Sequence, residues 1–148
     1  MICGIDPGRE KFGIAFGSVD ELMFSAIAPR EKMGGVLECL ATGDFEPMLE
    51  WRMEGRAPNG MKPSLVCLGN GTSHGIFKEK LEAMKIDCAL TDERMTTLEA
   101  RNLYWRLHRP SGIARMIPKS LRIPPRPIDD LAAWAILQRA CRDVANRR

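Results

Sequence analysis

Residues 1–8 read MICGIDPG and join a short apolar run to a carboxylate and a turn. The run from Ile2 to Ile5 is typical of a buried strand, which would end at Asp6. Pro7 and Gly8 supply turn chemistry, because proline presets φ and glycine accepts a positive φ. A carboxylate at the end of a buried strand is costly unless it is paired or binds a cation. Asp6 is therefore either the capping residue of an ordinary turn or a candidate site residue.

The segments that follow predict an antiparallel meander. Lys11–Phe16 and Leu22–Ile27 are short apolar strands, and the polar segment Ser18–Glu21 is the turn between them. Three strands joined by short turns pair with their neighbours in sequence.

Helical and extended patterns alternate in the rest of the chain. A helix is predicted after Gly34-Gly35, and a partly helical segment at Glu46–Arg52 is followed by a loop. A buried strand at Leu65–Leu68, a helix at Gly75–Met84 and a strand at Asp87–Leu90 come next. A helix from Thr96 to Leu107, with Thr96 and Glu99 as a capping box, precedes a last helix that starts at Asp129. This order predicts an α/β fold, in which a five-stranded mixed sheet is flanked by helices. Strands one to three would be antiparallel and the others parallel, in a single domain over residues 1–148 with a mobile basic loop at 108–127.

The composition narrows the class of protein. The hydrophobic fraction of 45% is sufficient for an ordinary core. No apolar run approaches the roughly 18 residues that cross a bilayer, and the first residues have no basic start and reach a carboxylate at Asp6, unlike a secretory signal. We therefore expect a cytoplasmic protein without a membrane partner. The five cysteines never occur as C-x-x-C, so they predict neither a zinc site nor a disulfide framework.

Acidic side chains recur where predicted elements begin or end. Besides Asp6 these are Asp92-Glu93, after the fifth strand, and Asp129-Asp130, at the start of the last helix. Each has an ordinary explanation, since aspartate favours turns and helix N-termini. Element termini of an α/β sheet nevertheless converge on one crevice. Carboxylates gathered there would repel one another unless a cation neutralised them, and oxygen-only ligands suit Mg²⁺ or Mn²⁺. We expect Asp6, Glu93 and Asp129 to be catalytic metal ligands, with Asp130 as a further ligand or as the alternative to Asp129.

The loop Gly69–Ser73 lies between the predicted central strand and the next helix. Its glycines permit close backbone approach, and Thr72 and Ser73 could hold a phosphate at the start of that helix. A plain turn explains the same residues equally well. The loop lacks the G-K-[ST] of a Walker motif.

A basic strip occupies the region between Glu99 and Asp129, which contains no acidic residue although the net charge of the chain is only +3. A strip of one sign predicts a polyanionic partner, although a solvated surface is the simpler reading of any charge run. The cations expected to hold nucleic-acid phosphates are Arg109, Lys119, Arg122 and Arg126.

Arg94, Tyr104 and Trp105 each have two possible roles. Arg94 would either clamp the scissile phosphate or form an ion pair with Asp92 or Asp87. Tyr104 and Trp105 would stack on bases, unless at least one of them belongs to the core.

Several motifs resemble, in matching order, those of the YqgF (RuvX) family of Holliday-junction-resolvase-like or pre-16S ribosomal RNA nucleases. They are Gly4–Gly8, Gly69–Thr72, the segment Asp92–Arg101 (DERMTTLEAR) and the segment Pro125–Ala133 (PRPIDDLAA). The resemblance implies a ribonuclease-H-like fold with two metal ions. By position it assigns the ligand roles to Asp6, Glu93 and Asp129, with Asp130 adjacent. Leu65–Leu68 lacks the fourth-strand acid of the related RuvC resolvases, which favours RNA processing over junction cleavage.

The expected function is therefore metal-dependent hydrolysis of RNA or DNA. The resemblance implies hydroxide attack on phosphorus, which leaves a 5′-phosphate and a 3′-hydroxyl. A nucleic-acid-binding module without catalysis is the first alternative, and one lobe of an actin-like ATPase is the second, because Gly4–Gly8 also resembles a phosphate motif of those proteins. The natural substrate, and whether the protein is a monomer or a homodimer, stay open.

Overall fold

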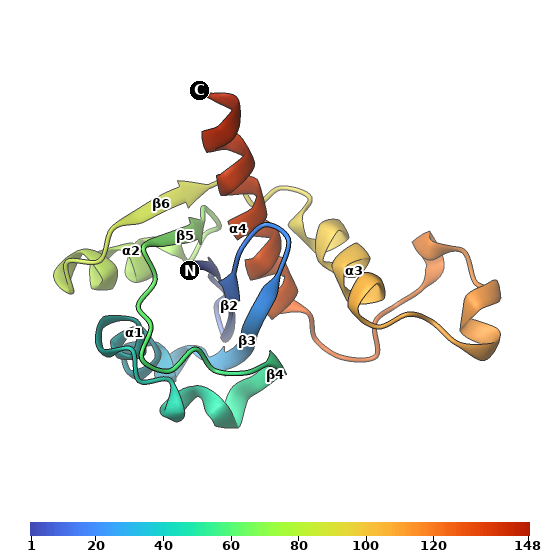
Figure 1. Ribbon diagram of the computed structural model, residues 1–148, viewed down its shortest axis with the longest axis horizontal. Coiled ribbons are helices and arrows are strands. Elements are labelled where there is room, and N and C mark those ends of the chain that lie inside the picture. The colour runs from blue at the N-terminus through green and yellow to red at the C-terminus, as the bar shows by residue number, and fades with distance from the viewer.

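The computed structural model describes residues 1–148 and contains one mixed sheet with helices on both faces (Figure 1). The strands are β1 (Ile2–Asp6), β2 (Lys11–Gly17), β3 (Leu22–Pro29), β4 (Arg52–Gly55), β5 (Leu65–Gly69) and β6 (Cys88–Thr91). The helices are α1 (Met33–Thr42), α2 (His74–Ala83), α3 (Thr96–Leu107) and α4 (Asp129–Asn146). The strand order across the sheet is β4-β3-β2-β1-β5-β6.

The strand directions confirm the predicted mixed sheet. β1 pairs antiparallel with β2, and β2 antiparallel with β3, as expected for a meander. β5 pairs parallel with β1, and β6 parallel with β5. As a result β1, β3, β5 and β6 all end at the same edge of the sheet, and β2 begins there.

The prediction of five strands is wrong, because the sheet has six. The segment Glu46–Trp51 forms a short 3₁₀ helix, but Arg52–Gly55 then pairs antiparallel with β3 as the edge strand β4 instead of forming a loop. Four residues are too few to show a period of two in the sequence. Their extended conformation depends on the neighbouring strand and on contacts that Glu54 makes with distant parts of the chain.

The two faces of the sheet carry side chains of different sizes. Large side chains of β1, β2 and β5 face α1 and α2 and form the main core: Ile5, Phe12, Ile14, Phe16, Val66 and Leu68. The alternate positions face α4 and are small: Gly4, Gly13, Ala15, Cys67 and Gly69. This alternation follows from the two-residue period of a strand.

Small residues allow α4 to lie directly against the sheet. A Cβ atom at Gly4 would lie 2.1 Å from the main-chain oxygen of Ala133, and one at Gly13 would lie 1.9 Å from that of Asp129. Any side chain at either glycine would therefore push α4 outwards. The close packing fixes the distance between the first turn of α4 and the sheet.

The predicted capping box at the start of α3 is wrong. The residue that precedes the helix is Met95, which has a φ of 68°, and no side chain caps the helix. The Thr96 hydroxyl instead donates to the main-chain oxygen of Glu93 at 2.7 Å. Glu99 accepts a hydrogen bond from Arg139 of α4 at 2.7 Å, so this acid joins two helices.

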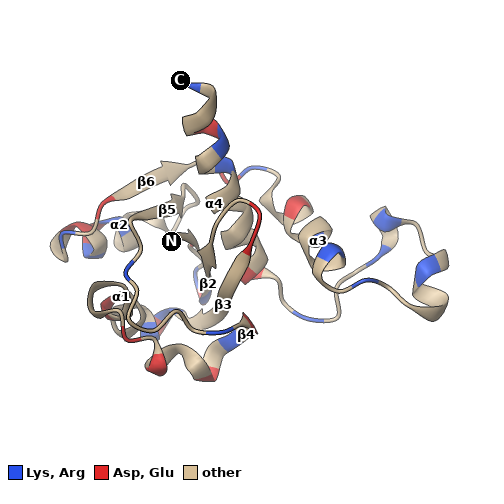
Figure 2. Cartoon of the chain, in the orientation of Figure 1, with Lys and Arg blue, Asp and Glu red and all other residues tan.

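Residues 108–127, which we call the basic arm, project from the side of the molecule beyond α3 (Figure 1). They were predicted to be an irregular loop, and their only regular structure is two short 3₁₀ helices at Gly112–Met116 and Lys119–Leu121. Lysine and arginine residues occur along the length of the arm (Figure 2). None of the helices has both the length and the apolar character needed for a membrane span.

Candidate functional site

Asp6 is the last residue of β1 and has a glycine beside it on each neighbouring strand. It pairs with Gly13 of β2, and Gly69 of β5 follows Leu68, the partner of Ile5. Because residues two apart share a face, Asp6 lies on the same face as Gly4, the face covered by α4. The two flanking glycines leave room beside the Asp6 carboxylate for groups from other elements.

Glu93 occupies the room on the β5 side. A Cβ atom at Gly69 would lie 2.6 Å from the Glu93 Oε2 atom, and one at Gly71 would lie 2.1 Å from its Oε1 atom. The backbone N–H of Glu93 donates to the Asn70 side chain at 3.3 Å, which ties the segment after β6 to the glycine loop. The Oε2 atom is buried and has no hydrogen-bond partner. A buried oxygen without a partner is unusual in proteins and indicates a place for an ion or a water molecule.

Asp129 approaches from the β2 side. Its main-chain oxygen lies over Gly13, and its side chain, 31% exposed, points to Lys11, whose Nζ lies 3.3 Å from Oδ2. Lys11 is the first residue of β2 and therefore stands at the edge where β1 ends. The three acids that were predicted as ligands thus come from the ends of β1 and β6 and the start of α4.

Burial and neighbouring charges change the protonation of two of these acids. Burial, followed by the charges of Glu93 and Asp129, raises the pKa of Asp6 to about 7. Burial also raises the pKa of Glu93, although contact with the Gly71 backbone N–H and the nearby His74 act in the opposite direction. Raised carboxylate pKa values mean that the site resists a full negative charge when no cation is present.

The chemistry of the residues fits a divalent metal, whereas their present spacing is wider than a ligand shell. All the donors are carboxylate oxygens, the set that Mg²⁺ and Mn²⁺ prefer, and the unpartnered Glu93 oxygen and the raised pKa of Asp6 both favour a cation. No three histidine, cysteine, aspartate or glutamate side chains lie close enough to share one ion in this conformation. Lys11 supplies the positive charge beside Asp129 instead.

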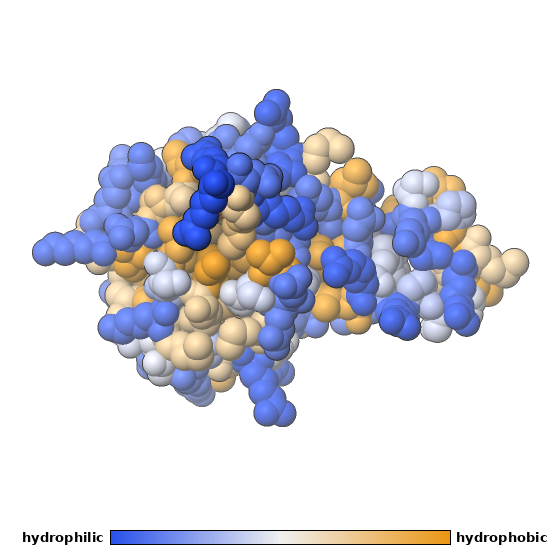
Figure 3. Space-filling model, turned by 45° about the horizontal axis from the view of Figure 1, so that its top comes forward, coloured by the Kyte–Doolittle hydropathy of each residue, from blue (hydrophilic) through white to orange (hydrophobic).

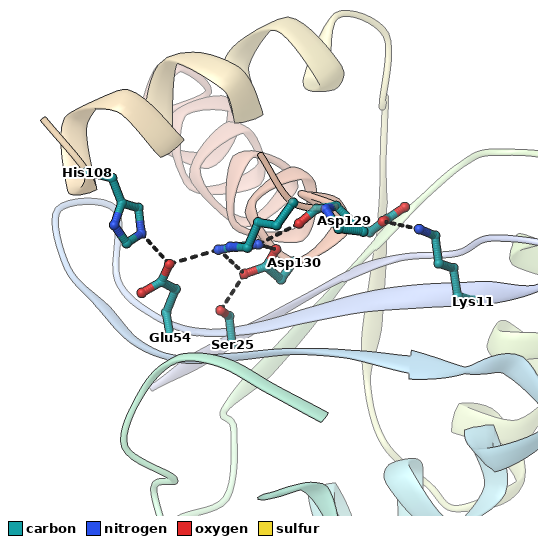
Figure 4. A network of polar contacts seen from close by, with 8 residues as sticks. Lys11, Ser25, Glu54, His108, Asp129 and Asp130 are labelled. Atoms are coloured by element: carbon teal, nitrogen blue, oxygen red, sulfur yellow. Dashed lines mark hydrogen bonds and ion pairs between the residues drawn. The ribbon is translucent and has the colours of Figure 1, made fainter. Parts of the chain in front are cut away.

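Asp130 does not join this group, although it was a predicted ligand. It is fully buried and faces the other side of the first turn of α4 (Figure 4). Its Oδ2 accepts a hydrogen bond from Ser25 at 2.6 Å, and its Oδ1 accepts one from Arg126 at 2.9 Å. Of the two adjacent aspartates, only Asp129 is directed towards the end of β1.

Arg126 and Arg94 were predicted to bind phosphates, and both are engaged by carboxylates. Arg126 bridges Asp130 and Glu54, with its Nη2 2.8 Å from Glu54 Oε1, and Glu54 also contacts His108 at 2.5 Å. Arg94 pairs with Asp92 at 2.8 Å, which is the second of its two predicted readings. The acids hold the pKa of Arg126 and that of Arg94 above the ordinary value, although burial opposes the rise in both.

The remaining predicted cations are available on the basic arm. Arg109 and Lys119 are exposed and form no ion pair. The Arg122 guanidinium donates to the main-chain oxygens of Ile117 and Arg115, which leaves its charge uncompensated. Tyr104 is buried in the α3–α4 core, so at least one of the two candidate stacking residues is structural.

Thr72 and Ser73 lie beside two arginines that the sequence analysis did not select. A hollow of about 410 Å³ is lined by Arg9, Arg30, Thr72, Ser73, Gly75 and Ile76, at the start of α2. Arg30 donates to the Ser73 hydroxyl at 3.3 Å. The topology could have predicted Arg30, because β3 runs in the same direction as β1 and ends at the same edge of the sheet. Arg9 follows the turn after Asp6 and could have been selected by its position.

The chain was compared with protein-family models, with curated proteins and with solved structures, and none of them matched it.

Proposed function

We propose that this protein is a nuclease that hydrolyses phosphodiester bonds of RNA or DNA with the help of Mg²⁺ or Mn²⁺. The observation that carries the proposal is the position of Asp6 between two glycines, where burial, and after it the charges of Glu93 and Asp129, raises its pKa. Acidic side chains that lie close together repel one another and destabilise a fold, unless a cation, a proton or a substrate group neutralises them. The motif resemblance to the YqgF family independently supports a nuclease with a ribonuclease-H-like fold.

Asp6, Glu93 and Asp129 would hold the metal ions. Bound there, Mg²⁺ or Mn²⁺ supplies an activated water and neutralises charge on the phosphate that is attacked. Asp6 contributes a carboxylate from the rigid end of a central strand, and the glycine loop keeps Glu93 beside it. Asp130 and its network contribute indirectly, because they fix the first turn of α4 and hence the direction of Asp129.

Two groups of cations would hold the nucleic-acid backbone on either side of these carboxylates. Arg9, Arg30 and the start of α2 form one group, and Arg109 and Lys119 of the basic arm belong to the other. Such contacts position the backbone without reading sequence, so the affinity should fall as the salt concentration rises.

A binding module without catalysis is the second candidate, and one observation favours it. The acids do not form a ligand shell in this conformation, and Lys11 already neutralises Asp129. In that case the cations would bind nucleic acid and the acids would have no chemical role.

The two candidates are distinguished by offering labelled single-stranded RNA, single-stranded DNA, duplexes and a four-way junction with Mg²⁺, Mn²⁺ or EDTA. For the nuclease, we expect cleavage that requires the metal and that disappears in Asp6→Asn, while binding is retained. Asp20→Asn, which removes an exposed acid at the opposite end of β2, serves as the matched control and should cleave normally. Binding without cleavage under every condition would leave only the binding module.

A further inference from the structure

A pocket of about 400 Å³ lies between the second half of α3 and the basic arm, away from the carboxylates. It is lined by Asn102, Trp105, Arg106, Pro110, Lys119 and Arg122. Three of these side chains are cationic and none is acidic. The arm and the helix therefore form a small cationic hollow between them.

Trp105 gives this pocket a flat, supported aromatic wall. Its ring meets Tyr104 edge-on, with the ring centroids 4.9 Å apart and the planes at 88°. Tyr104 is held in turn by stacking on His108 and by the Arg126 guanidinium, 5.5 Å from its ring. The Trp105 indole N–H is buried without a hydrogen-bond partner, so a nearby acceptor would relieve an unpaired donor. The ring is thus positioned by the protein core while its residue remains partly exposed.

The charges of the pocket are not neutralised within the protein. Arg106 and Lys119 form no ion pair, and Arg122 is bound only by main-chain oxygens. Exposed apolar side chains accompany them on the arm, where Ile113, Met116 and Ile123 are each at least 78% exposed. Figure 3 shows the resulting mixture of hydrophilic and hydrophobic atoms on the projecting part of the molecule.

We propose that this pocket binds one nucleotide of a single-stranded nucleic acid. The base would lie against Trp105 and Pro110, and the adjoining phosphates would face Arg106, Lys119 and Arg122. Aromatic stacking combined with a cationic groove is how proteins bind single strands, whose bases are free to leave the stack. A duplex keeps its bases stacked on one another and gains only the phosphate contacts. An acidic peptide would use the cations but would leave the aromatic wall without a matching planar group.

The position of the pocket connects it to the carboxylates. α3 begins at Thr96, three residues after Glu93, and Trp105 follows nine residues later, about 14 Å along the helix axis. A strand with one base in the pocket could therefore reach the acids within a few nucleotides. This connection rests on the proposed nuclease function, whereas binding in the pocket does not.

The test measures binding of fluorescent single-stranded RNA, single-stranded DNA and a duplex of the same sequence to full-length protein carrying Asp6→Asn, in EDTA. Trp105→Ala should weaken single-strand binding about 5- to 100-fold and change duplex binding little, and Trp105→Phe should restore most of the affinity. Lys119→Ala should lower the affinity for single strand and duplex alike and reduce the salt dependence of both affinities. Lys62→Ala, which removes an exposed cation elsewhere, should change neither.

Ultraviolet cross-linking of the single strand followed by peptide mapping supplies a readout that is independent of folding, and we expect the cross-link in the peptide containing Trp105. Equal affinities of Trp105→Ala and the parent protein for the single strand, a cross-link confined to other peptides, or preferential binding of an acidic peptide would each overturn the proposal. Single-strand binding at Trp105 without any cleavage by the wild type would support nucleotide binding in the pocket and contradict the nuclease function. Cleavage of single strands that is unaffected by Trp105→Ala would support the nuclease function and contradict nucleotide binding in the pocket.

Discussion

The Arg126 guanidinium lies 2.9 Å from the carboxylate of Asp130, four residues further along the chain, and the same guanidinium contacts Glu54 of the edge strand at 2.8 Å. Asp130 is fully buried, and the Arg126 side chain is 20% exposed. This pair joins the end of the basic arm to β4 and to the first turn of α4, the turn that carries Asp129 (Figure 4). It links the outermost strand of the sheet to the candidate site.

Removing one member of this pair should destabilise the protein strongly. Arg126→Met leaves Asp130 charged and buried, which costs about 3–5 kcal/mol in comparable pairs. We expect a loss of that order in the free energy of unfolding, measured by urea denaturation near neutral pH. Arg109→Met removes an exposed arginine of the same arm and should change the free energy by about 0.5 kcal/mol or less. Similar losses in the two variants would show that the network does not hold α4.

Gly71→Ala should displace Glu93 while leaving the fold intact. The added methyl group would lie 2.1 Å from the Glu93 Oε1 atom, and a flexible carboxylate can swing away. We expect metal affinity, measured by calorimetric titration, to fall about 10- to 100-fold, as it does when a group that orients a ligand is lost.

Gly75→Ala is the matched control for this substitution. A Cβ atom there meets no other atom within 4 Å, and the position is the second residue of α2. Stability should rise by about 0.5 kcal/mol or less, because alanine favours a helix but the position lies in its first turn, and metal affinity should not change. Equal metal affinity in Gly71→Ala and the wild type would mean that Glu93 is not a ligand.

The raised pKa of Asp6 predicts a stability that falls as the pH rises. The folded protein keeps a proton on Asp6 up to about pH 7, whereas the unfolded chain releases it near the ordinary value of 3.8. Stability from this group is therefore lost between about pH 4 and pH 7 and stays constant above that range. In EDTA, Asp6→Asn should raise the free energy of unfolding at pH 8 by on the order of 2–4 kcal/mol, and the gain should shrink at pH 5.

Metal reverses the pH dependence at the same residue. A bound divalent ion requires the deprotonated carboxylate, so metal affinity and cleavage should both decline as the pH falls through about 7. Thermal unfolding at several Mn²⁺ concentrations and pH values measures this effect. An affinity independent of pH between 5 and 8 would exclude Asp6 from the ligands.

Lys11 should compete with metal for Asp129. The pair is partly exposed, with side chains 48% and 31% accessible, so its loss in Lys11→Gln should cost about 1 kcal/mol or less without metal. Removing the ammonium also removes its repulsion of a divalent ion, which should raise metal affinity about fivefold. Lys78→Gln breaks a surface pair with Glu82 and should leave metal binding unchanged. A lower metal affinity in Lys11→Gln would show that Lys11 supports the site and does not compete with the ion.

Much of the architecture was predictable because it depends on local patterns. Short apolar runs at β1 and β2 predict strands, and short turns at Pro7-Gly8 and Ser18–Glu21 predict their antiparallel pairing. The positions of Asp6, Glu93 and Asp129 at element termini follow from the same patterns. Their approach to one another follows from the parallel strands that share one edge.

The tertiary structure alone decided the details that depend on direction and on distant partners. Successive residues of a helix point about 100° apart, so only the packing of α4 on Gly4 and Gly13 determines that Asp129 faces Lys11 while Asp130 faces Ser25. The edge strand β4 depends on a partner strand far away in sequence. Residue types and periodicity encode where an element begins and ends, whereas the free energy of packing selects which of two adjacent side chains enters a site.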